Sequence, residues 1–232
     1  SVKDKDGKYY ADYTGIMSVG WNADKYGDIS SLDDLLDPKF AGTVALNGKP
    51  AEAGAAFNGY LMANQLAGGD INNLQPGLDY FKKLKEAGNL TTVDVTNGTI
   101  DSGQTGVVFD WTYNQASYKK ELKDKGVNWK YKTFPKAQVV SYYNQAINKD
   151  APHPAAARLW EEDLYTADAQ NLWFKGGANP VLLDSMKEDG TVDQATLKDA
   201  ITIEGEPVSY TNDDSTRITE WLQNNWDKTI GN

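Results

Sequence analysis

Short apolar segments alternate with helix-forming segments along the first 150 residues. Strands are predicted at residues 16–21, 43–46, 90–95, 106–109, 127–134 and 138–147, and helices at residues 30–36, 53–66, 74–86 and 113–123. Strands that alternate with helices are typical of βαβ units, in which helices cover the faces of a parallel sheet. The sequence therefore predicts an α/β fold with a mixed, largely parallel sheet.

The pattern changes after residue 148, from alternating strands and helices to mostly helix. Helices are predicted at residues 155–165 and 168–175, and a final amphipathic helix ends near Trp226. Trp160 and Trp173 lie on these helices among apolar neighbours, and we expect both to pack. The change of pattern indicates that the chain leaves one lobe there and enters another.

Charge and residue types exclude several classes of function. The chain has 23 Lys and Arg against 33 Asp and Glu, a formal net charge of −10, which argues against nucleic acid or an anionic membrane surface as the main partner.

It has no cysteine and a single histidine, His153, so thiolate sites are excluded and we expect no metal and no cofactor. No apolar stretch approaches the length of a membrane span. The chain opens without methionine or an apolar signal core, so it reads as processed or as cut from something longer.

Several motifs resemble catalytic patterns without matching them. Residues 98–105 come within one residue of a phosphate-binding loop, but Gln104 stands where the lysine belongs and a strand follows instead of a helix. Carboxylate pairs such as Asp33 and Asp34 occur where helix caps or exposed faces are expected. We therefore expect no catalysis. A hydrolytic or carbohydrate-active enzyme with two carboxylates in one cleft is the alternative, together with a non-catalytic interaction domain whose aromatic residues are buried.

Aromatic residues mark two candidate ligand contacts. Asp110, Trp111 and Tyr113 follow an apolar strand, and ligands of open α/β sheets bind beyond the carboxyl ends of strands. An aromatic ring beside a carboxylate suits an amine, a sugar or another flat or cationic group, although packing of Trp111 is an open alternative. Tyr142 and Tyr143 are consecutive in a strand, so at most one of them can face a given cleft.

A glycine-containing loop, residues 47–55, joins a short strand to a helix. The small residues, including Gly54, leave the backbone N–H groups at the start of the helix open to an anion or a carbonyl group, and an ordinary loop is the alternative. Asn47 at the head of this loop and Asn22, which closes the first strand, complete the candidate ligand-binding residues.

The order and spacing of several segments resemble a known family. These segments are residues 6–10 (DGKYY), 19–26 (VGWNADKY), 30–46 (SSLDDLLDPKFAGTVAL), 103–111 (GQTGVVFDW) and 151–160 (APHPAAARLW). Together they are similar to the bacterial extracellular solute-binding proteins of ABC importers, in the iron, polyamine and phosphonate group with type II periplasmic-binding topology.

The resemblance implies two lobes joined by a hinge, a small solute held between them, and delivery of that solute to a membrane permease from the periplasm or the extracellular face. It implies a first-lobe remnant and hinge at residues 1–21, a second α/β lobe at residues 22–134, and a hinge strand with the mostly helical remainder of the first lobe at residues 135–232. Family members usually have about a hundred more residues ahead of residue 6. We therefore expect a truncated chain, which could form an oligomer or a swapped assembly.

The resemblance also bears on the ligand. Ferric-binding relatives use adjacent tyrosines shortly after the strand that matches residues 107–109, where this chain has Asp110 and Trp111. Polyamine binders place a tryptophan near Trp111 and meet ammonium groups with carboxylates. A polyamine, a phosphonate or a similar polar solute is therefore expected in preference to ferric iron.

Overall fold

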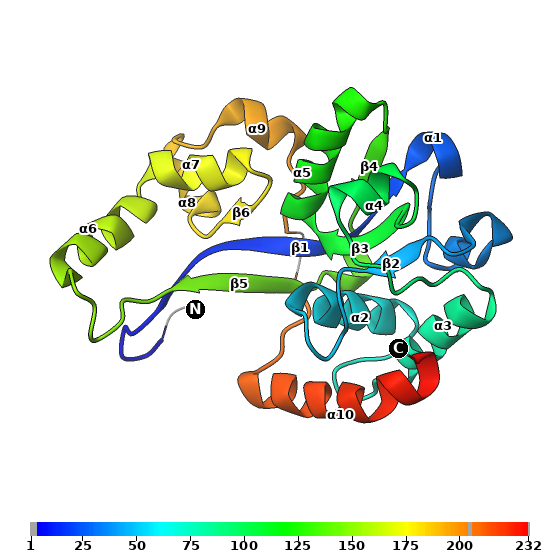
Figure 1. Cartoon of the computed structure of the whole chain (residues 1–232). Coiled ribbons are helices and arrows are strands. Elements are labelled where there is room, and N and C mark those ends of the chain that lie inside the picture. Colours follow the sequence, from blue (N-terminus) through cyan, green and yellow to red (C-terminus); the bar gives the residue numbers. More distant parts are fainter. Residues whose placement is uncertain (1–3, 204–205, 232) are drawn as a thin grey trace. The chain divides into compact units, whose positions relative to one another are not determined.

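The computed structural model describes residues 4–203 and 206–231, and their contacts divide the chain into two compact units. We call Ser1–Gly15 with Ser141–Ile203 the smaller unit, and Ile16–Val140 with Glu204–Asn232 the larger unit. The backbone passes from one unit to the other three times, within β1 (Tyr10–Asn22), within β5 (Val140–Gln145), and after residue 203 (Figure 1).

A mixed sheet lies at the centre of the larger unit. Its strands follow the order β2 (Val44–Leu46), β3 (Val107–Trp111), β1 and β4 (Trp129–Lys132). β2 and β3 pair in parallel, whereas β1 pairs antiparallel with both β3 and β4. The prediction of an α/β fold with a mixed sheet is confirmed, but this sheet is not largely parallel, because two of its three strand pairs are antiparallel.

Helices cover this sheet. They are α1 (Ala23–Tyr26), α2 (Gly54–Leu66), α3 (Gln75–Glu86), α4 (Asn97–Asp101), α5 (Thr112–Leu122) and α10 (Asn212–Ile230), with short 3₁₀ turns η1 (Asp33–Leu36), η2 (Pro38–Phe40), η3 (Lys123–Lys125) and η4 (Pro135–Ala137). α2 is buried from Ala56 to Asn64, because it packs on β2 and β3 and against α3. No helix of the described residues combines the length and the apolar character that crossing a membrane requires.

The last helix completes the core of the larger unit. α10 places Ile218, Leu222, Trp226 and Ile230 on one face at four-residue spacing, and the ring centroid of Trp226 lies 5.2 Å from that of Phe81 on α3. The family resemblance implies that all of residues 135–232 belong to the other lobe. In the structure, the part of this segment that forms α10 packs with the larger unit, because its apolar face covers α3 (Figure 1).

The smaller unit has fewer strands and a smaller core. It contains the first half of β1, most of β5, β6 (Asn179–Pro180), and the helices α6 (Pro154–Leu164), α7 (Ala167–Lys175), α8 (Leu183–Asp189) and α9 (Gln194–Asp199). β6 pairs antiparallel with β1. The buried cluster of this unit consists of Phe174, Leu183, Met186 and Val192.

The predicted strand at residues 90–95 is wrong for most of its length. Leu90 forms a single parallel bridge with Val44, and residues 91–96 are not part of a strand. Most of these residues are exposed or half-buried, so the β-prone composition is not matched by a neighbouring strand. By contrast, β1 is longer than predicted, because it begins at Tyr10, six residues before the predicted start.

Candidate functional site

Polar side chains gather where the two parallel strands of the larger unit end. Leu46 of β2 is in register with Phe109 of β3, so Asn47 and Asp110 come directly after two paired residues. The backbone N–H of Asn47 donates to the Phe109 carbonyl oxygen over 3.3 Å, which holds the two segments together. The carboxyl ends of parallel strands are the usual place for a ligand in an open α/β sheet.

The Asp110 carboxylate is fully buried and accepts four hydrogen bonds. Its Oδ1 accepts from the Trp111 backbone N–H (2.7 Å) and from Asn114 Nδ2 (2.9 Å). Its Oδ2 accepts from Asn47 Nδ2 (2.8 Å) and from the Tyr118 hydroxyl (2.9 Å). Burial raises the pKa of Asp110 above its usual value, and the four donors oppose that rise. The carboxylate therefore ties the loop after β2 to the first turns of α5.

The two asparagines have a defined orientation, because an ionised carboxylate can only accept hydrogen bonds. Asn47 and Asn114 each turn the NH₂ group toward Asp110, so each amide oxygen turns away from it. Both residues are half-buried, and neither amide oxygen accepts a hydrogen bond from the described residues. Asn114 is not among the residues predicted from the sequence, although its position four residues after Asp110 at the start of a helix is a usable signal.

A second layer fixes α5 on the sheet. The Tyr118 ring packs edge-on against Trp129 of β4, with 6.2 Å between centroids. Trp129 Nε1 donates to Gln115 Oε1 (2.8 Å), and Gln115 Nε2 donates to the Val108 carbonyl oxygen (3.0 Å). Burial and the nearby Asp110 charge raise the pKa of Tyr118, so the hydroxyl stays protonated as a donor.

Trp111 and Tyr113 lie beside this cluster. The Trp111 side chain is buried in the core of the larger unit, and its ring stacks on that of Tyr113 with 6.3 Å between centroids and 16° between planes. Tyr113 is half-buried. The packing interpretation of Trp111, left open by the sequence, accounts for these contacts.

Asn22 and Gly54 lie at the starts of helices. Asn22 Oδ1 accepts from the backbone N–H groups of Asp24 and Lys25 and so caps α1. Gly54 is the first residue of α2, and within the described part of the chain this helix begins without a side-chain cap. The structure thus gives Asn22 a local role as a helix cap, and the ligand-binding roles of Asn22 and Gly54 stay predictions.

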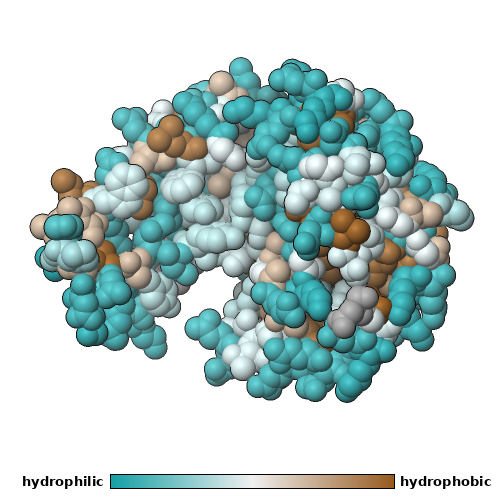
Figure 2. Space-filling model, in the orientation of Figure 1, coloured by the Kyte–Doolittle hydropathy of each residue, from teal (hydrophilic) through white to brown (hydrophobic). Residues whose placement is uncertain are grey.

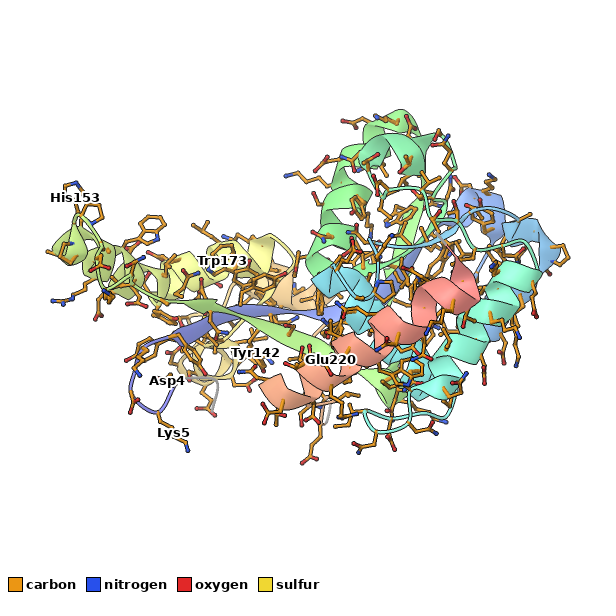
Figure 3. All side chains as sticks on the ribbon, turned by 60° about the horizontal axis from the view of Figure 1, so that its bottom comes forward. Asp4, Lys5, Tyr142, His153, Trp173 and Glu220 are labelled. Atoms are coloured by element: carbon orange, nitrogen blue, oxygen red, sulfur yellow. The ribbon has the colours of Figure 1, made fainter. Side chains whose placement is uncertain are left out.

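Tyr142 and Tyr143 belong to the smaller unit and differ in their surroundings. Tyr143 stacks on Tyr13 of β1 (4.9 Å between centroids), and Tyr13 stacks on Trp173 of α7 (4.3 Å), so three rings form a continuous row. Burial and the charge of Asp184 raise the pKa of Tyr142. Figure 3 shows Tyr142 and Trp173 on opposite sides of the β1–β5 ribbon.

Behind this aromatic row lies a buried carboxylate that the sequence analysis missed. Asp12 Oδ1 accepts from Gln170 Nε2 (2.9 Å), and Asp12 Oδ2 accepts from Gln145 Nε2 (3.1 Å). Burial raises the pKa of Asp12. Nothing in the sequence pattern separates Asp12 from the exposed acids near the start of the chain, because its partners are more than a hundred residues away.

A separate groove and the potential metal ligands complete the candidate sites. A groove of about 710 Å³ lies at the carboxyl end of α2, away from Asn47, and its lining includes Tyr80, Phe134 and four charged side chains: Asp33, Asp79, Lys83 and Lys136. Within residues 4–203 and 206–231, no three His, Asp or Glu side chains gather in a group that could hold a metal ion.

Comparison with known proteins places the chain in a family. The model of the family described as bacterial extracellular solute-binding protein matches residues 1–200. No curated protein matches the chain. Among solved structures, the chain is similar to the periplasmic binding protein AfuA from Actinobacillus pleuropneumoniae with exogenous fructose-6-phosphate bound, at 20% identity and a TM-score of 0.68, over 98% of this chain and 70% of AfuA.

Two further structures agree in fold. Iron-bound HitA from Pseudomonas aeruginosa is 20% identical with a TM-score of 0.65, over 96% of this chain and 71% of HitA. The spermidine/putrescine ABC transporter substrate-binding protein PotD from Streptococcus pneumoniae is 14% identical with a TM-score of 0.67, over 97% of this chain and 70% of PotD. The family match over most of the chain, on a fold shared with periplasmic binding proteins, confirms the resemblance noted in the sequence: the chain belongs to the bacterial extracellular solute-binding proteins.

Proposed function

We propose that the chain is the solute-binding component of an ABC importer, which captures a small polar solute and delivers it to a membrane permease. Its place of action is the periplasm or the extracellular face of the cell membrane. The observation that carries the proposal is the pair of amides, Asn47 and Asn114, held by one buried carboxylate at the carboxyl ends of β2 and β3. This arrangement offers polar groups on a rigid frame, as recognition of a small polar molecule requires.

Binding without chemical change is the proposed mode of action. The buried Asp110 has all of its hydrogen-bonding capacity directed to the protein, so it supports neighbouring groups instead of transferring a proton to a solute. A solute that binds the folded chain shifts the population toward the bound conformation by its differential affinity for that state. That shift is the signal by which a permease would distinguish loaded from empty protein.

In the larger unit, the proposed contacts are the amide oxygens of Asn47 and Asn114. In the smaller unit, Tyr143, whose ring is 42% exposed, stays a predicted ligand contact. Asp110 orients the two amides from within the larger unit, and Trp111, which follows it in the chain, stacks on Tyr113. Asn22, Gly54 and Tyr142 stay predicted ligand contacts. The solute classes proposed are a polyamine, a phosphonate or a similar small polar molecule.

The test is a thermal-unfolding panel with diamines, polyols, sugar phosphates, phosphonates and metal salts. A solute present at a hundred times its Kd stabilises the folded state by about 2.7 kcal/mol, which raises Tm by roughly 5–10 °C for a chain of this size. Sodium chloride at matched ionic strength is the control for nonspecific salt effects. An unchanged Tm with every class of solute would contradict the proposal. Stimulation of the permease ATPase by loaded protein, in reconstituted membranes, tests delivery separately.

A further inference from the structure

The charge preference of the site follows from the four hydrogen bonds that Asp110 accepts. Each of its two oxygens already has two donors, one of them an asparagine NH₂ group. Turning either amide over would place its carbonyl oxygen about 3 Å from a carboxylate oxygen, where two acceptors repel. Asp110 therefore fixes the orientation of Asn47 and Asn114, and both present an acceptor oxygen on the side away from it.

The positive end of α5 does not offset this preference. The first turn of a helix attracts anions through its unpaired N–H groups. Here Asp110 lies two residues before Thr112, the first residue of α5, and accepts the Trp111 N–H, so a carboxylate of the protein already faces that end of the helix. An incoming oxyanion would meet the acceptor oxygens of two amides with a buried negative charge behind them.

We infer that the solute presents hydrogen-bond donors to the amide oxygens of Asn47 and Asn114, as an ammonium, a guanidinium or a set of hydroxyl groups does, and that Asp110 is the positioning residue for this selectivity. The inference rests on the proposed function and narrows its ligand class. It places an oxyanionic head group outside this part of the site.

The test measures affinity by titration calorimetry for three solute sets of similar size: diamines and guanidinium compounds, uncharged polyols, and phosphonates with sugar phosphates. The wild-type protein is expected to bind a cationic compound or a polyol at least tenfold more tightly than any oxyanion. Whether the cationic compounds or the polyols bind more tightly shows whether the donors are charged groups or hydroxyl groups. Asn47→Ala and Asn114→Ala are each expected to weaken that binding about tenfold. Asn224→Ala is the matched control, because Asn224 is an exposed amide on α10 that bonds within its own helix.

Asp110→Asn separates positioning from simple support of the fold. An amide at position 110 no longer forces the two neighbouring amides into one orientation, so the ratio of donor to oxyanion affinity is expected to fall, a change that a loss of stability alone does not produce. Tightest binding of an oxyanion, or unchanged affinities in folded Asn47→Ala and Asn114→Ala, would overturn the inference and leave the proposed function standing. Absence of binding in all three sets would overturn both. If a variant does not fold, the wild-type ranking of the three sets decides the inference by itself.

Discussion

The hydroxyl of Tyr118 donates a hydrogen bond to Asp110 across 2.9 Å, and this bond joins the second turn of α5 to the end of β3. The two residues are coupled in both directions. The Asp110 charge raises the pKa of Tyr118, and the Tyr118 hydroxyl is one of the donors that lower the pKa of Asp110 against the effect of burial. The pair is therefore a structural support for the asparagines around it.

Tyr118→Phe is expected to lower the free energy of unfolding by about 1–3 kcal/mol, because it leaves a buried carboxylate oxygen with one donor fewer. The ring and its contact with Trp129 are kept, so the loss reports the hydrogen bond alone. Urea denaturation monitored by tryptophan fluorescence gives the value. Tyr9→Phe is the control, since Tyr9 is exposed and a phenol-to-phenyl change there is expected to cost close to nothing. Equal effects of the two substitutions would contradict this role of the Tyr118 hydroxyl.

The candidate site shows what the sequence can and cannot predict. Asn47 and Asp110 were found because each follows a short apolar strand, and the ends of neighbouring parallel strands meet at one edge of a sheet. Which atoms face outward was not predictable, since it depends on the register that puts Asn47 within hydrogen-bonding distance of Asp110. The sequence therefore predicts Asp110 as a ligand contact, whereas in the structure Asp110 orients the amides of Asn47 and Asn114.

The fold was predictable where periodicity is local. The helix predicted at residues 53–66 and the strand predicted at residues 106–109 have their patterns within one segment, and α2 and β3 overlap those segments. Residues 90–95 have a strand-like composition, but a strand also needs a partner, and only Leu90 has one. The place of α10 in the larger unit depends on contacts with residues more than a hundred positions earlier, which no local pattern contains.

Two glycines are expected to respond oppositely to alanine. At Gly54 a Cβ would meet no atom within 4 Å, so Gly54→Ala is expected to stabilise the fold by about 0.4–1 kcal/mol through the unfolded chain. At Gly20 a Cβ would clash with Gln115 Oε1 and would lie 2.8 Å from the Trp129 ring, so Gly20→Ala is expected to push α5 off the sheet and to lower Tm. Differential scanning calorimetry of both variants checks the sign of each change. A stable Gly20→Ala protein would show that the Gln115 contact yields at little cost.

The exposed apolar side chains of α6 and α7 offer a contrast with the core. Trp160 is 64% exposed, although the sequence analysis expected it to pack, and Leu159 and Leu172 are 73% and 70% exposed (Figure 2 shows hydrophobic atoms over α6). Trp160→Ala is therefore expected to cost less than about 1 kcal/mol, because little apolar surface returns to water. Trp129→Ala, at a side chain that is 1% exposed, is expected to cost about 3–5 kcal/mol. Comparable losses in urea denaturation would show that Trp160 is buried in solution.

Asp214 provides a test of stability against pH. Asp214 and Thr211 form a capping box at the start of α10, and the Thr211 N–H and hydroxyl donors lower the pKa of Asp214 to about 2 from an ordinary 3.8. A carboxyl whose pKa is lower in the folded state stabilises that state fully above the unfolded pKa and loses the effect as pH falls through the folded pKa. The Tm difference between wild type and Asp214→Asn is therefore expected to be constant from pH 7 to about pH 5 and to shrink between about pH 4 and pH 2. Asp28→Asn is the control, because Asp28 is an exposed carboxylate that forms an ion pair with Lys130. A Tm difference between wild type and Asp214→Asn that is the same at every pH would contradict the capping role of Asp214.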